Sequence, residues 1–360
     1  SEAHKVLRTM PMMTSPGCLV PLAEEMKKAL RIPVITVGRI NHPALAEDII
    51  AKGQADLVAM GRALLADPQL PRKAFEEKEG EIRICIACNE GCYKRIFQQL
   101  DIRCSINPTT GREEEISTAK AAAPKRVVVI GAGPAGMEAA HAAWERGHEV
   151  LLLEKSREVG GQLNLASLPP GRKEIENFRN FLHDRLQRSD VKILKPKTAT
   201  GTFVKEYGPD VVILAVGAHP RKIRVKGLGK ERMIPSWDIL RSKGDPREPI
   251  LVLGAGLVGC EAADLLSEAG KKVVLVEILP EIATAGDADT KAYFTLKFKK
   301  NKVEVFTGAT LLRVEGNTAI LQREKDESPD EVGSVVAAVG AESSDGLLEE
   351  LVSARLSVIK

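Results

Sequence analysis

The chain has 360 residues, of which 44% are hydrophobic and 28% charged, with a formal net charge of only +3. This composition is that of an ordinary soluble protein with two or three domains, and the dispersed charge and 4% aromatic content exclude nucleic acid or an anionic membrane as an expected partner. No apolar run reaches the ~18 residues of a membrane-spanning helix. The first residues do not read as a signal peptide, and we expect a cytoplasmic location.

Residues 1–80 read as alternating helices and short buried strands. We expect helices at 19–30, 43–52 and 70–80, and strands at 33–37 and 56–60. The two strands end in Gly38-Arg39 and Gly61-Arg62, and glycine amides beside arginines bind phosphate in the loops after the last two strands of many (β/α)₈ barrels. The alternative is two ordinary turns with arginines facing solvent. A barrel needs ~200 residues or more, so at most its last two or three units are here.

Four of the six cysteines, Cys85, Cys88, Cys92 and Cys104, fall within one short stretch. A disulfide framework does not suit a long chain with so few cysteines, and a structural zinc site usually shows two Cys-x-x-Cys pairs where this sequence has one. Three thiolates on a tight loop and a fourth further along predict an iron–sulfur cluster, [4Fe-4S], with zinc as the alternative. The acidic and alanine-rich residues 113–124 then read as a linker, with a domain boundary near residue 124.

A dinucleotide-binding fingerprint follows the linker. A buried strand (125–130) runs into Gly131-Ala132-Gly133-Pro134-Ala135-Gly136, and a helix (137–146) and a strand (149–153) lead to Glu154. The glycines permit a tight turn, close approach of a pyrophosphate and packing of the helix on the strand, and the terminal carboxylate accepts hydrogen bonds from ribose hydroxyls. The whole pattern within about 30 residues is a much stronger signal than the glycines alone.

The same pattern recurs in residues 249–277. A strand (249–253) leads to Gly254-Ala255-Gly256-Leu257-Val258-Gly259, a helix and a strand (272–276) that ends at Glu277. Two complete fingerprints predict two bound nucleotides, and the alternative is a duplicated fold with one inactive site. Because the Glu277 carboxylate accepts from a free 2′-hydroxyl and repels a 2′-phosphate, NADH is favoured over NADPH unless arginines elsewhere bind the phosphate.

Two further buried strands, at 209–217 and 334–340, end in small residues. Each is interpreted as the strand that closes a nucleotide-binding unit, where the lack of bulk at Ala215 and Gly217, for example, leaves room for a cofactor beside the backbone. A plain core strand is the alternative.

Together these motifs resemble the NADH:flavin oxidoreductases of the 2,4-dienoyl-CoA reductase and 2-enoate reductase type, and more distantly trimethylamine dehydrogenase. The similarity covers residues 30–360, and the cysteine motif with its trailing Asn107-Pro108 is its most specific part. In that family an FMN-binding barrel precedes a [4Fe-4S] segment and an FAD domain that is interrupted by an NAD(P)H domain. The resemblance implies an α/β fold in five parts: the C-terminal part of a (β/α)₈ barrel (1–80), the cluster segment and linker (81–123), two Rossmann-like domains in a glutathione-reductase-like arrangement for FAD (124–247) and NAD(P)H (248–341), and a return to the FAD domain (342–360).

The resemblance also implies roles for single residues. The expected cluster ligands are Cys85, Cys88, Cys92 and Cys104. The expected FMN phosphate loops hold Gly38, Arg39, Gly61 and Arg62. The expected FAD contacts are Gly131, Gly133, Pro134, Ala135, Gly136, Glu154, Lys155, Gly160, Gly161, Gln162, Ala215 and Gly217. The expected NAD(P)H contacts are Gly254, Gly256, Leu257, Val258, Gly259 and Glu277.

The sequence lacks the family's first barrel strands, with their proton-donating Tyr and active-site His, and its last FAD-binding segment. We therefore expect a fragment or an incomplete chain without catalytic acid–base residues, in which retention of FMN is open. The hypothesis is that electrons pass from NADH through FAD and the cluster to FMN, for reduction of an enoate or enoyl-CoA double bond. The alternatives are an amine dehydrogenase of the trimethylamine type and a noncatalytic electron-transfer module. The expected partner is a small-molecule substrate, and a homo-oligomer is left open.

Overall fold

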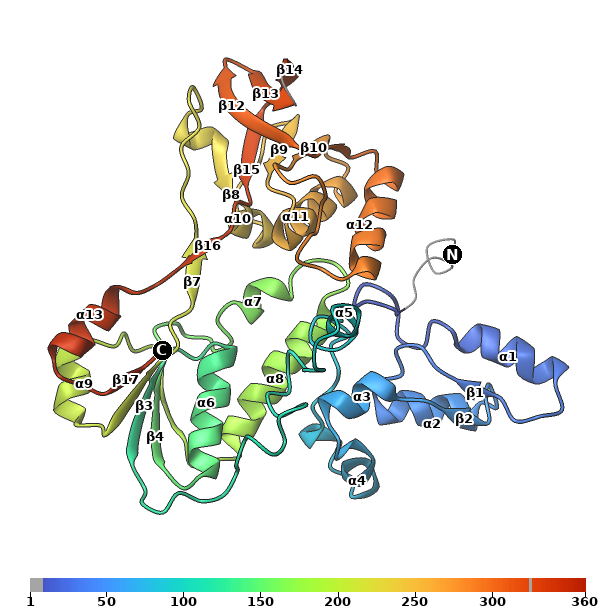
Figure 1. Cartoon of the computed structure of the whole chain (residues 1–360), viewed down its shortest axis with the longest axis vertical. Coiled ribbons are helices and arrows are strands. Elements are labelled where there is room, and N and C mark those ends of the chain that lie inside the picture. Colours follow the sequence, from blue (N-terminus) through green and yellow to red (C-terminus); the bar gives the residue numbers. More distant parts are fainter. Residues whose placement is uncertain (1–8, 324–325) are drawn as a thin grey trace. The chain divides into compact units, whose positions relative to one another are not determined.

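The computed structural model describes residues 9–323 and 326–360, so the part of the barrel assignment that falls on residues 1–8 lies outside the described residues. Two compact units are present (Figure 1). The main unit consists of Met12–Ser167, Arg172–Ala218 and Ser343–Lys360, and the insert unit consists of Leu168–Gly171 and His219–Glu342, together with residues 9–11. Residues 219–247, expected in the FAD domain, therefore cluster with the insert unit. In the described ranges no helix is long and apolar enough to span a membrane.

The main unit begins with two consecutive βα units. The two short strands pair in parallel, with Ile35 opposite Leu57, and the connecting helix buries Ile49 beneath them. The elements in order are α1 (Val20–Ala29), β1 (Ile35–Thr36), α2 (Pro43–Ala51), β2 (Leu57–Val58), α3 (Gly61–Ala66) and α4 (Leu70–Phe75). The helix expected at 70–80 is shorter, because Glu77 adopts a left-handed φ of 57° and a 3₁₀ turn (Glu79–Glu81) follows.

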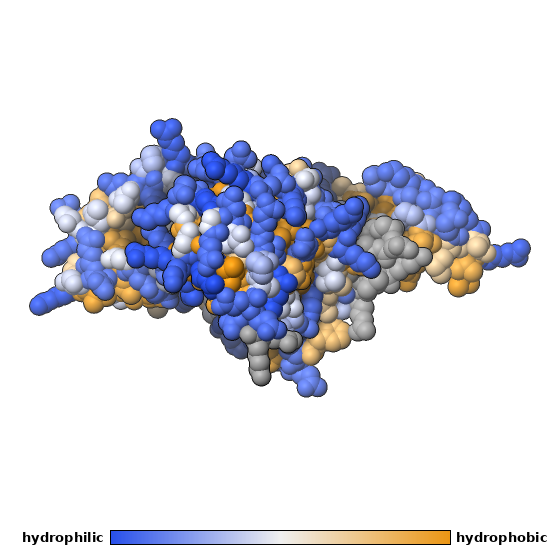
Figure 2. Space-filling view, turned by 90° about the horizontal axis from the view of Figure 1, so that it is seen from above, coloured by the Kyte–Doolittle hydropathy of each residue, from blue (hydrophilic) through white to orange (hydrophobic). Residues whose placement is uncertain are grey.

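Several large apolar side chains of these βα units are exposed. Leu22, Met26 and Ile32 are exposed by 63%, 56% and 67%. Figure 2 shows apolar surface interspersed with hydrophilic surface on the face that it presents. Two βα units alone therefore cover only part of the apolar surface of their own strands and helices.

The cysteine segment has little regular structure, apart from α5 (Tyr93–Phe97). It leads into a five-stranded parallel sheet in the order β17-β6-β3-β4-β5. The strands are β3 (Arg126–Ile130), β4 (Glu149–Leu153), β5 (Lys192–Leu194), β6 (Val211–Leu214) and β17 (Val358–Ile359), and the helices are α6 (Pro134–Glu145), α7 (Leu163–Ala166), α8 (Lys173–Gln187), α9 (Gly201–Tyr207) and α13 (Gly346–Ser353).

This sheet is buried on both faces. Val127 and Val129 of β3 pack in one core with α6 and α8, and Val128 and Ile130 pack in another with residues of α9 and α13. Alternate side chains of a strand point to opposite faces, so the uninterrupted apolar run of β3 is what a sheet with helices on both faces requires. The last strand of the chain, β17, pairs with β6 and thereby returns residues 343–360 to the main unit.

The insert unit repeats this design. Its five parallel strands lie in the order β11-β10-β9-β15-β8, and a three-stranded antiparallel sheet, β12-β13-β14, packs its Leu311 and Leu321 in one core with Val274 and Val276. The strands are β8 (Met233–Pro235), β9 (Ile250–Leu253), β10 (Val273–Val276), β11 (Glu304–Phe306), β12 (Ala309–Glu315), β13 (Thr318–Arg323), β14 (Asp326–Glu331) and β15 (Ser334–Ala337), and the helices are α10 (Ser236–Leu240), α11 (Leu257–Glu268) and α12 (Ala288–Lys300). The chain leaves and re-enters the main unit through β7 (Ala218–Pro220) and β16 (Ala341–Ser343), which pair with each other.

Candidate functional site

The four clustered cysteines line one pocket of the main unit, together with Arg62 and Asn89. The amide of Ala87 donates a hydrogen bond of 3.3 Å to Cys85 Sγ. Cys88 Sγ donates to Ser105 Oγ at 3.4 Å. In the described part of the chain, no three His, Cys, Asp or Glu side chains are placed to hold a single metal ion. A four-iron cluster asks for a wider arrangement, because its thiolates bind separate irons rather than one ion.

A backbone contact brings the distant Cys104 to the other three cysteines. The Arg103 amide donates to the Gly91 carbonyl at 2.7 Å. A Cβ atom at Gly91 would lie 2.6 Å from the Arg103 carbonyl oxygen and 2.9 Å from Cys104 Cα. Gly91 is therefore the point where the two arms of the segment press together, and only a residue without a side chain fits there.

Burial opposes ionisation of these thiols. It raises the pKa of Cys85 to about 11, and it also raises the pKa of Cys92 and Cys104. The Arg62 guanidinium acts in the opposite direction on the pKa of Cys85 and Cys92. Thiolates bind metals, and a bound metal group would supply positive charge that favours ionisation of these thiols. Four thiols around one pocket, with an amide directed at sulfur, have the donor chemistry of an iron–sulfur site.

Arg39 and Arg62 are the two arginines of the expected FMN phosphate loops. Burial, helped by the nearby charge of Arg62, lowers the pKa of Arg39 to about 10. The Arg39 side chain is 1% exposed, donates to the Met12 carbonyl at 2.8 Å and pairs with Glu174. Arg39 Nε is buried without a hydrogen-bond partner. Arg62 donates to Asn89 Oδ1 at 2.6 Å. Neither guanidinium is simply solvated, so the alternative of two arginines facing solvent is not what the structure presents.

The glycines adjoining these arginines differ in their surroundings. Gly38 has a φ of 116°, and a Cβ there would lie 2.9 Å from Leu19 Cγ. Gly61 begins α3 and has open space at the Cβ position. Gly38 therefore serves packing, and Gly61 leaves backbone open to a ligand.

The first fingerprint forms a tight strand–loop–helix turn. A Cβ at Gly131 would lie 2.4 Å from the Ala215 carbonyl oxygen, and one at Gly136 would lie 1.8 Å from the Gly131 carbonyl oxygen. Gly133, between them, has open space at the same position, where a pyrophosphate would approach. Glu154 is buried and accepts from the Ala132 amide at 2.8 Å and the Ser156 amide at 2.7 Å, so its carboxylate also shapes the loop.

The other expected FAD contacts gather around this loop. The Gly160 amide donates to the Ala132 carbonyl at 2.7 Å. A Cβ at Gly161 would lie 2.9 Å from Gly133 Cα, and one at Gly217 would lie 3.4 Å from Gln162 Nε2. Pro134 and Ala135 begin α6, and Lys155 is exposed after Glu154. The strands are parallel, so the residues that follow β3, β4 and β6 all emerge at the C-terminal edge of the sheet, where such folds bind nucleotides.

The second fingerprint has the same geometry in the insert unit. A Cβ at Gly254 would lie 2.6 Å from the Ala338 carbonyl oxygen, one at Gly259 would lie 1.9 Å from the Gly254 carbonyl oxygen, and Gly256 has open space. Glu277 accepts from the Ala255 amide at 2.5 Å and from the Leu279 amide at 2.9 Å. Leu257 and Val258 form the first turn of α11. Neither copy has lost any element of the fingerprint.

Two side chains that fix the cysteine segment, Asn41 and Asn107, were given no role of their own at the sequence level. Asn41 donates from Nδ2 to the Cys85 carbonyl at 2.8 Å. Asn107 accepts from Arg83 at 2.9 Å and donates to the Leu65 carbonyl at 3.2 Å. Asn107 had a sequence signal, its position before Pro108, but its partners are more than 20 residues away along the chain. Nothing in the sequence points to Asn41.

Comparison with known proteins agrees with this geometry. Residues 125–357 match the pyridine nucleotide-disulphide oxidoreductase family, and residues 11–81 match the NADH:flavin oxidoreductase / NADH oxidase family. The chain belongs to the pyridine nucleotide-disulphide oxidoreductase family. The preceding match confirms that this family's nucleotide-binding region follows part of a flavin oxidoreductase barrel, as the resemblance implied.

The chain is also similar to known proteins over most of its length. The chain is 44% identical to an NADH oxidase of Thermoanaerobacter brockii over 320 residues. This alignment covers 86% of this chain and 49% of the relative. It is 34% identical over 344 residues to a cinnamate reductase of Clostridium sporogenes, covering 95% of this chain and 51% of the relative. A 2-naphthoyl-CoA reductase structure superposes with a TM-score of 0.90 at 27% identity, over 97% of this chain and 54% of the other. The chain thus spans about half the length of these flavin oxidoreductase relatives.

Proposed function

We propose that this chain oxidises NADH at the second fingerprint and passes the electrons to FAD at the first and to a [4Fe-4S] cluster at Cys85, Cys88, Cys92 and Cys104. In the full-length protein the electrons would continue to FMN and reduce the activated carbon–carbon double bond of an unsaturated acid or acyl-CoA. The similarity to a cinnamate reductase and a naphthoyl-CoA reductase supports this substrate class.

One observation carries the proposal: two complete fingerprints and a four-cysteine pocket occur in one chain. Each fingerprint keeps an open glycine, Gly133 or Gly256, between two packed ones, and each has a carboxylate that holds the loop. Nicotinamide delivers a hydride and an iron–sulfur cluster takes single electrons, and a flavin exchanges electrons in both ways. A chain with all three sites is suited to convert one kind of transfer into the other.

The residues of the chain supply binding and orientation. The loop amides around Gly133 and Gly256, each at the start of a helix, suit a pyrophosphate. Glu154 and Glu277 position those loops and present carboxylate oxygens at the strand ends, where ribose hydroxyls would lie. Arg62 adds positive charge beside the cysteines. We assign no acid or base of the chemical step to these residues.

The cofactor content tests the proposal directly. The chain is purified without oxygen, its iron and sulfide are counted, and its flavins are extracted and separated. We expect about four irons and one FAD per chain, and a Cys104→Ser variant should lose iron while keeping FAD. Stoichiometric zinc, or fewer than about two irons in the unaltered chain, would overturn the cluster assignment.

The electron path is tested by flavin bleaching and dye reduction. NADH should bleach the flavin faster than NADPH, because Glu277 repels a 2′-phosphate. NADH-dependent dye reduction without enoate turnover would restrict this chain to the electron-transfer part of the activity. Binding of ADP in place of FAD at the first fingerprint would instead favour the amine dehydrogenase alternative.

A further inference from the structure

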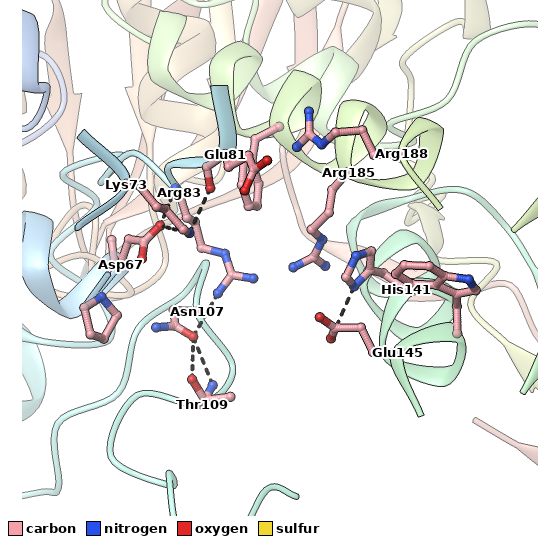
Figure 3. A pocket seen from close by; sticks show the side chains of 14 residues that line it. Asp67, Lys73, Glu81, Arg83, Asn107, Thr109, His141, Glu145, Arg185 and Arg188 are labelled. Atoms are coloured by element: carbon pink, nitrogen blue, oxygen red, sulfur yellow. Dashed lines mark hydrogen bonds and ion pairs between the residues drawn. The ribbon is translucent and has the colours of Figure 1, made fainter. Parts of the chain in front are cut away.

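A second pocket of the main unit, of about 570 Å³, contains none of the residues assigned above to a nucleotide and none of the four cysteines, although Asn107 of the cysteine segment lines it. Its wall combines Asp67 and Lys73 from the α3–α4 region, Arg83 beside the cysteine segment, and His141 and Arg185 from α6 and α8 (Figure 3). The C-terminal half of α6 contributes Trp144, roughly 12 Å along the helix from Gly136 at ~1.5 Å per residue. The Trp144 end of the pocket is therefore remote from the first fingerprint.

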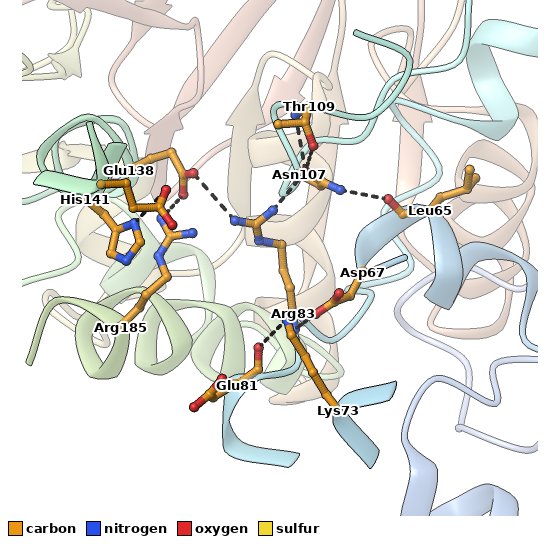
Figure 4. Close-up of polar contacts among 11 residues, drawn as sticks. Leu65, Asp67, Lys73, Glu81, Arg83, Asn107, Thr109, Glu138, His141 and Arg185 are labelled. Atoms are coloured by element: carbon orange, nitrogen blue, oxygen red, sulfur yellow. Dashed lines mark hydrogen bonds and ion pairs between the residues drawn. The ribbon is translucent and has the colours of Figure 1, made fainter. Parts of the chain in front are cut away.

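Two arginines in this pocket share one carboxylate. Arg83 lies 3.5 Å from Glu138, and Arg185 lies 2.5 Å from the other oxygen of the same carboxylate. The side chains of Arg83 and Arg185 are only 13% and 15% exposed. Figure 4 shows both guanidinium groups at the Glu138 carboxylate. Two guanidinium groups thus converge on one carboxylate.

The other carboxylates of the wall offset part of the positive charge, since Asp67 interacts electrostatically with Arg83 and Glu145 with both arginines. Asp67 accepts from the Gln69 amide, from Lys73 and from the Arg83 amide, at 3.0, 2.6 and 2.9 Å. Glu145 lies 3.4 Å from the His141 ring. Glu81 is exposed, so solvent screens its charge. At the end of α8, Arg188 adds a further exposed positive charge to the wall.

The arginines also have unused hydrogen-bonding capacity. The Nε atoms of Arg83 and Arg185 are buried without hydrogen-bond partners. Buried donors without partners are costly, and an anion with several acceptor oxygens would give the two guanidinium groups further acceptors.

Aromatic surfaces lie beside the guanidinium pair. The Phe181 ring centroid is 5.3 Å from Arg83 Cζ and 5.4 Å from Arg185 Cζ. The Trp144 indole also lines the pocket, and its Nε1 donates to Asp190 at 3.2 Å, which fixes the ring. A cavity of this size, with convergent donors and two aromatic side chains in a largely polar wall, could hold a small polar molecule.

We propose that this pocket binds a small phosphate-bearing anion, with Arg83 and Arg185 contacting the phosphate oxygens and Trp144 and Phe181 contacting an attached planar organic group. Arginine is the side chain best suited to bidentate phosphate recognition. The same Arg83 donates to Asn107 at 2.9 Å, so the ligand would contact a residue that joins the two arms of the cysteine segment.

Calorimetric titration of the full, FAD-loaded chain tests this site with two probes, inorganic phosphate and phenyl phosphate. Both should bind saturably, and phenyl phosphate should bind more tightly because it adds a planar group. Arg185→Gln should weaken both by about tenfold or more, since a charged hydrogen-bond donor is lost. Arg31→Gln removes an exposed arginine outside the pocket and should change nothing. Equal affinity of the two probes would assign the site to free phosphate, against the aromatic part of the proposal.

A second variant separates binding from folding. Arg185→Gln leaves Arg83 and Glu138 as a one-to-one pair, so its iron and FAD content should equal that of the unaltered chain. Glu138→Gln removes the carboxylate that competes with the ligand, and it should strengthen phosphate binding several-fold. The proposal is wrong if no saturable binding occurs, if Arg185→Gln binds as tightly as the unaltered chain, or if Glu138→Gln binds more weakly.

Discussion

Gly91 has no side chain at the point where the two arms of the cysteine segment come together. Its carbonyl receives the Arg103 amide, and its Cα faces the backbone of Cys104. The spacing of the cysteines predicted that the fourth thiol would join the other three, but it did not predict which residue lets the two arms meet. That contact brings the backbone of Gly91 against the backbone of Arg103 and Cys104. A glycine in a loop does not by itself indicate such a contact in the sequence.

Replacement of Gly91 by alanine should therefore disrupt the cysteine pocket. The new Cβ would meet backbone atoms at 2.6–2.9 Å, and backbone cannot rotate away as a side chain can. Overpacking of this kind costs about 1–3 kcal/mol, and we expect iron content to fall below about half. Gly80→Ala is the matched control, because nothing lies within 4 Å of its Cβ position. Normal iron content in Gly91→Ala would contradict this account.

The Glu277 carboxylate accepts a hydrogen bond from the loop and carries a negative charge, and a glutamine at this position could supply only the first. Glu277→Gln keeps one oxygen that can accept from the Ala255 amide, but it loses the negative charge that disfavours a 2′-phosphate. We expect the ratio of the efficiency with NADH to the efficiency with NADPH in flavin reduction to fall about tenfold. This factor corresponds to the loss of one charged hydrogen bond. Glu281→Gln, at a carboxylate that is 59% exposed, should leave the ratio unchanged. An unchanged ratio in Glu277→Gln would place nucleotide selection elsewhere.

At the scale of elements, the regular strands and helices were predictable because their apolar periods are strong. The strand expected at 149–153 is β4 (Glu149–Leu153), and the helix expected at 137–146 is α6 (Pro134–Glu145). The helix expected at 70–80 was wrong beyond Phe75, since the left-handed Glu77 has no sequence marker. The pairing of Arg39 with Glu174 was also out of reach, because 135 residues separate them.

The turn between β9 and α11 gives a prediction that separates packing from binding. A Cβ at Gly259 would lie 1.9 Å from the Gly254 carbonyl oxygen, whereas Gly256 has nothing within 4 Å. Gly259→Ala should therefore destabilise the insert unit by about 1–3 kcal/mol, measured by denaturant unfolding. Gly256→Ala should keep normal stability but weaken NADH binding, because its methyl group occupies the space where the pyrophosphate approaches. Equal stability of the two variants would show that the turn tolerates a side chain at both positions.

At the scale of the whole molecule, the chain crosses between its two units at 218–219 and 342–343, and a short excursion, Leu168–Gly171, also clusters with the insert unit. The two fingerprints predicted two nucleotide-binding domains, but not that residues 219–247 would cluster with the second of them. This segment contains β8, which pairs with β15 on the edge of the insert unit's sheet. A strand of three residues is too short for a pattern of apolar residues to be recognised, so its pairing cannot be predicted from the sequence.

Each unit has its own core and its own fingerprint, so each should respond to its own ligand. Calorimetric unfolding of the chain should show two transitions. A ligand at 100 times its Kd stabilises its site by about 2.7 kcal/mol, which is a shift of several degrees for a unit of this size. FAD should raise the unfolding temperature of the main unit, and NAD⁺ that of the insert unit.

Gly136→Ala, whose Cβ would lie 1.8 Å from the Gly131 carbonyl oxygen, should remove the FAD-dependent shift and leave the NAD⁺-dependent shift intact. A single transition that both ligands raise equally would mean that the two units unfold as one, and that the fingerprints are not energetically independent.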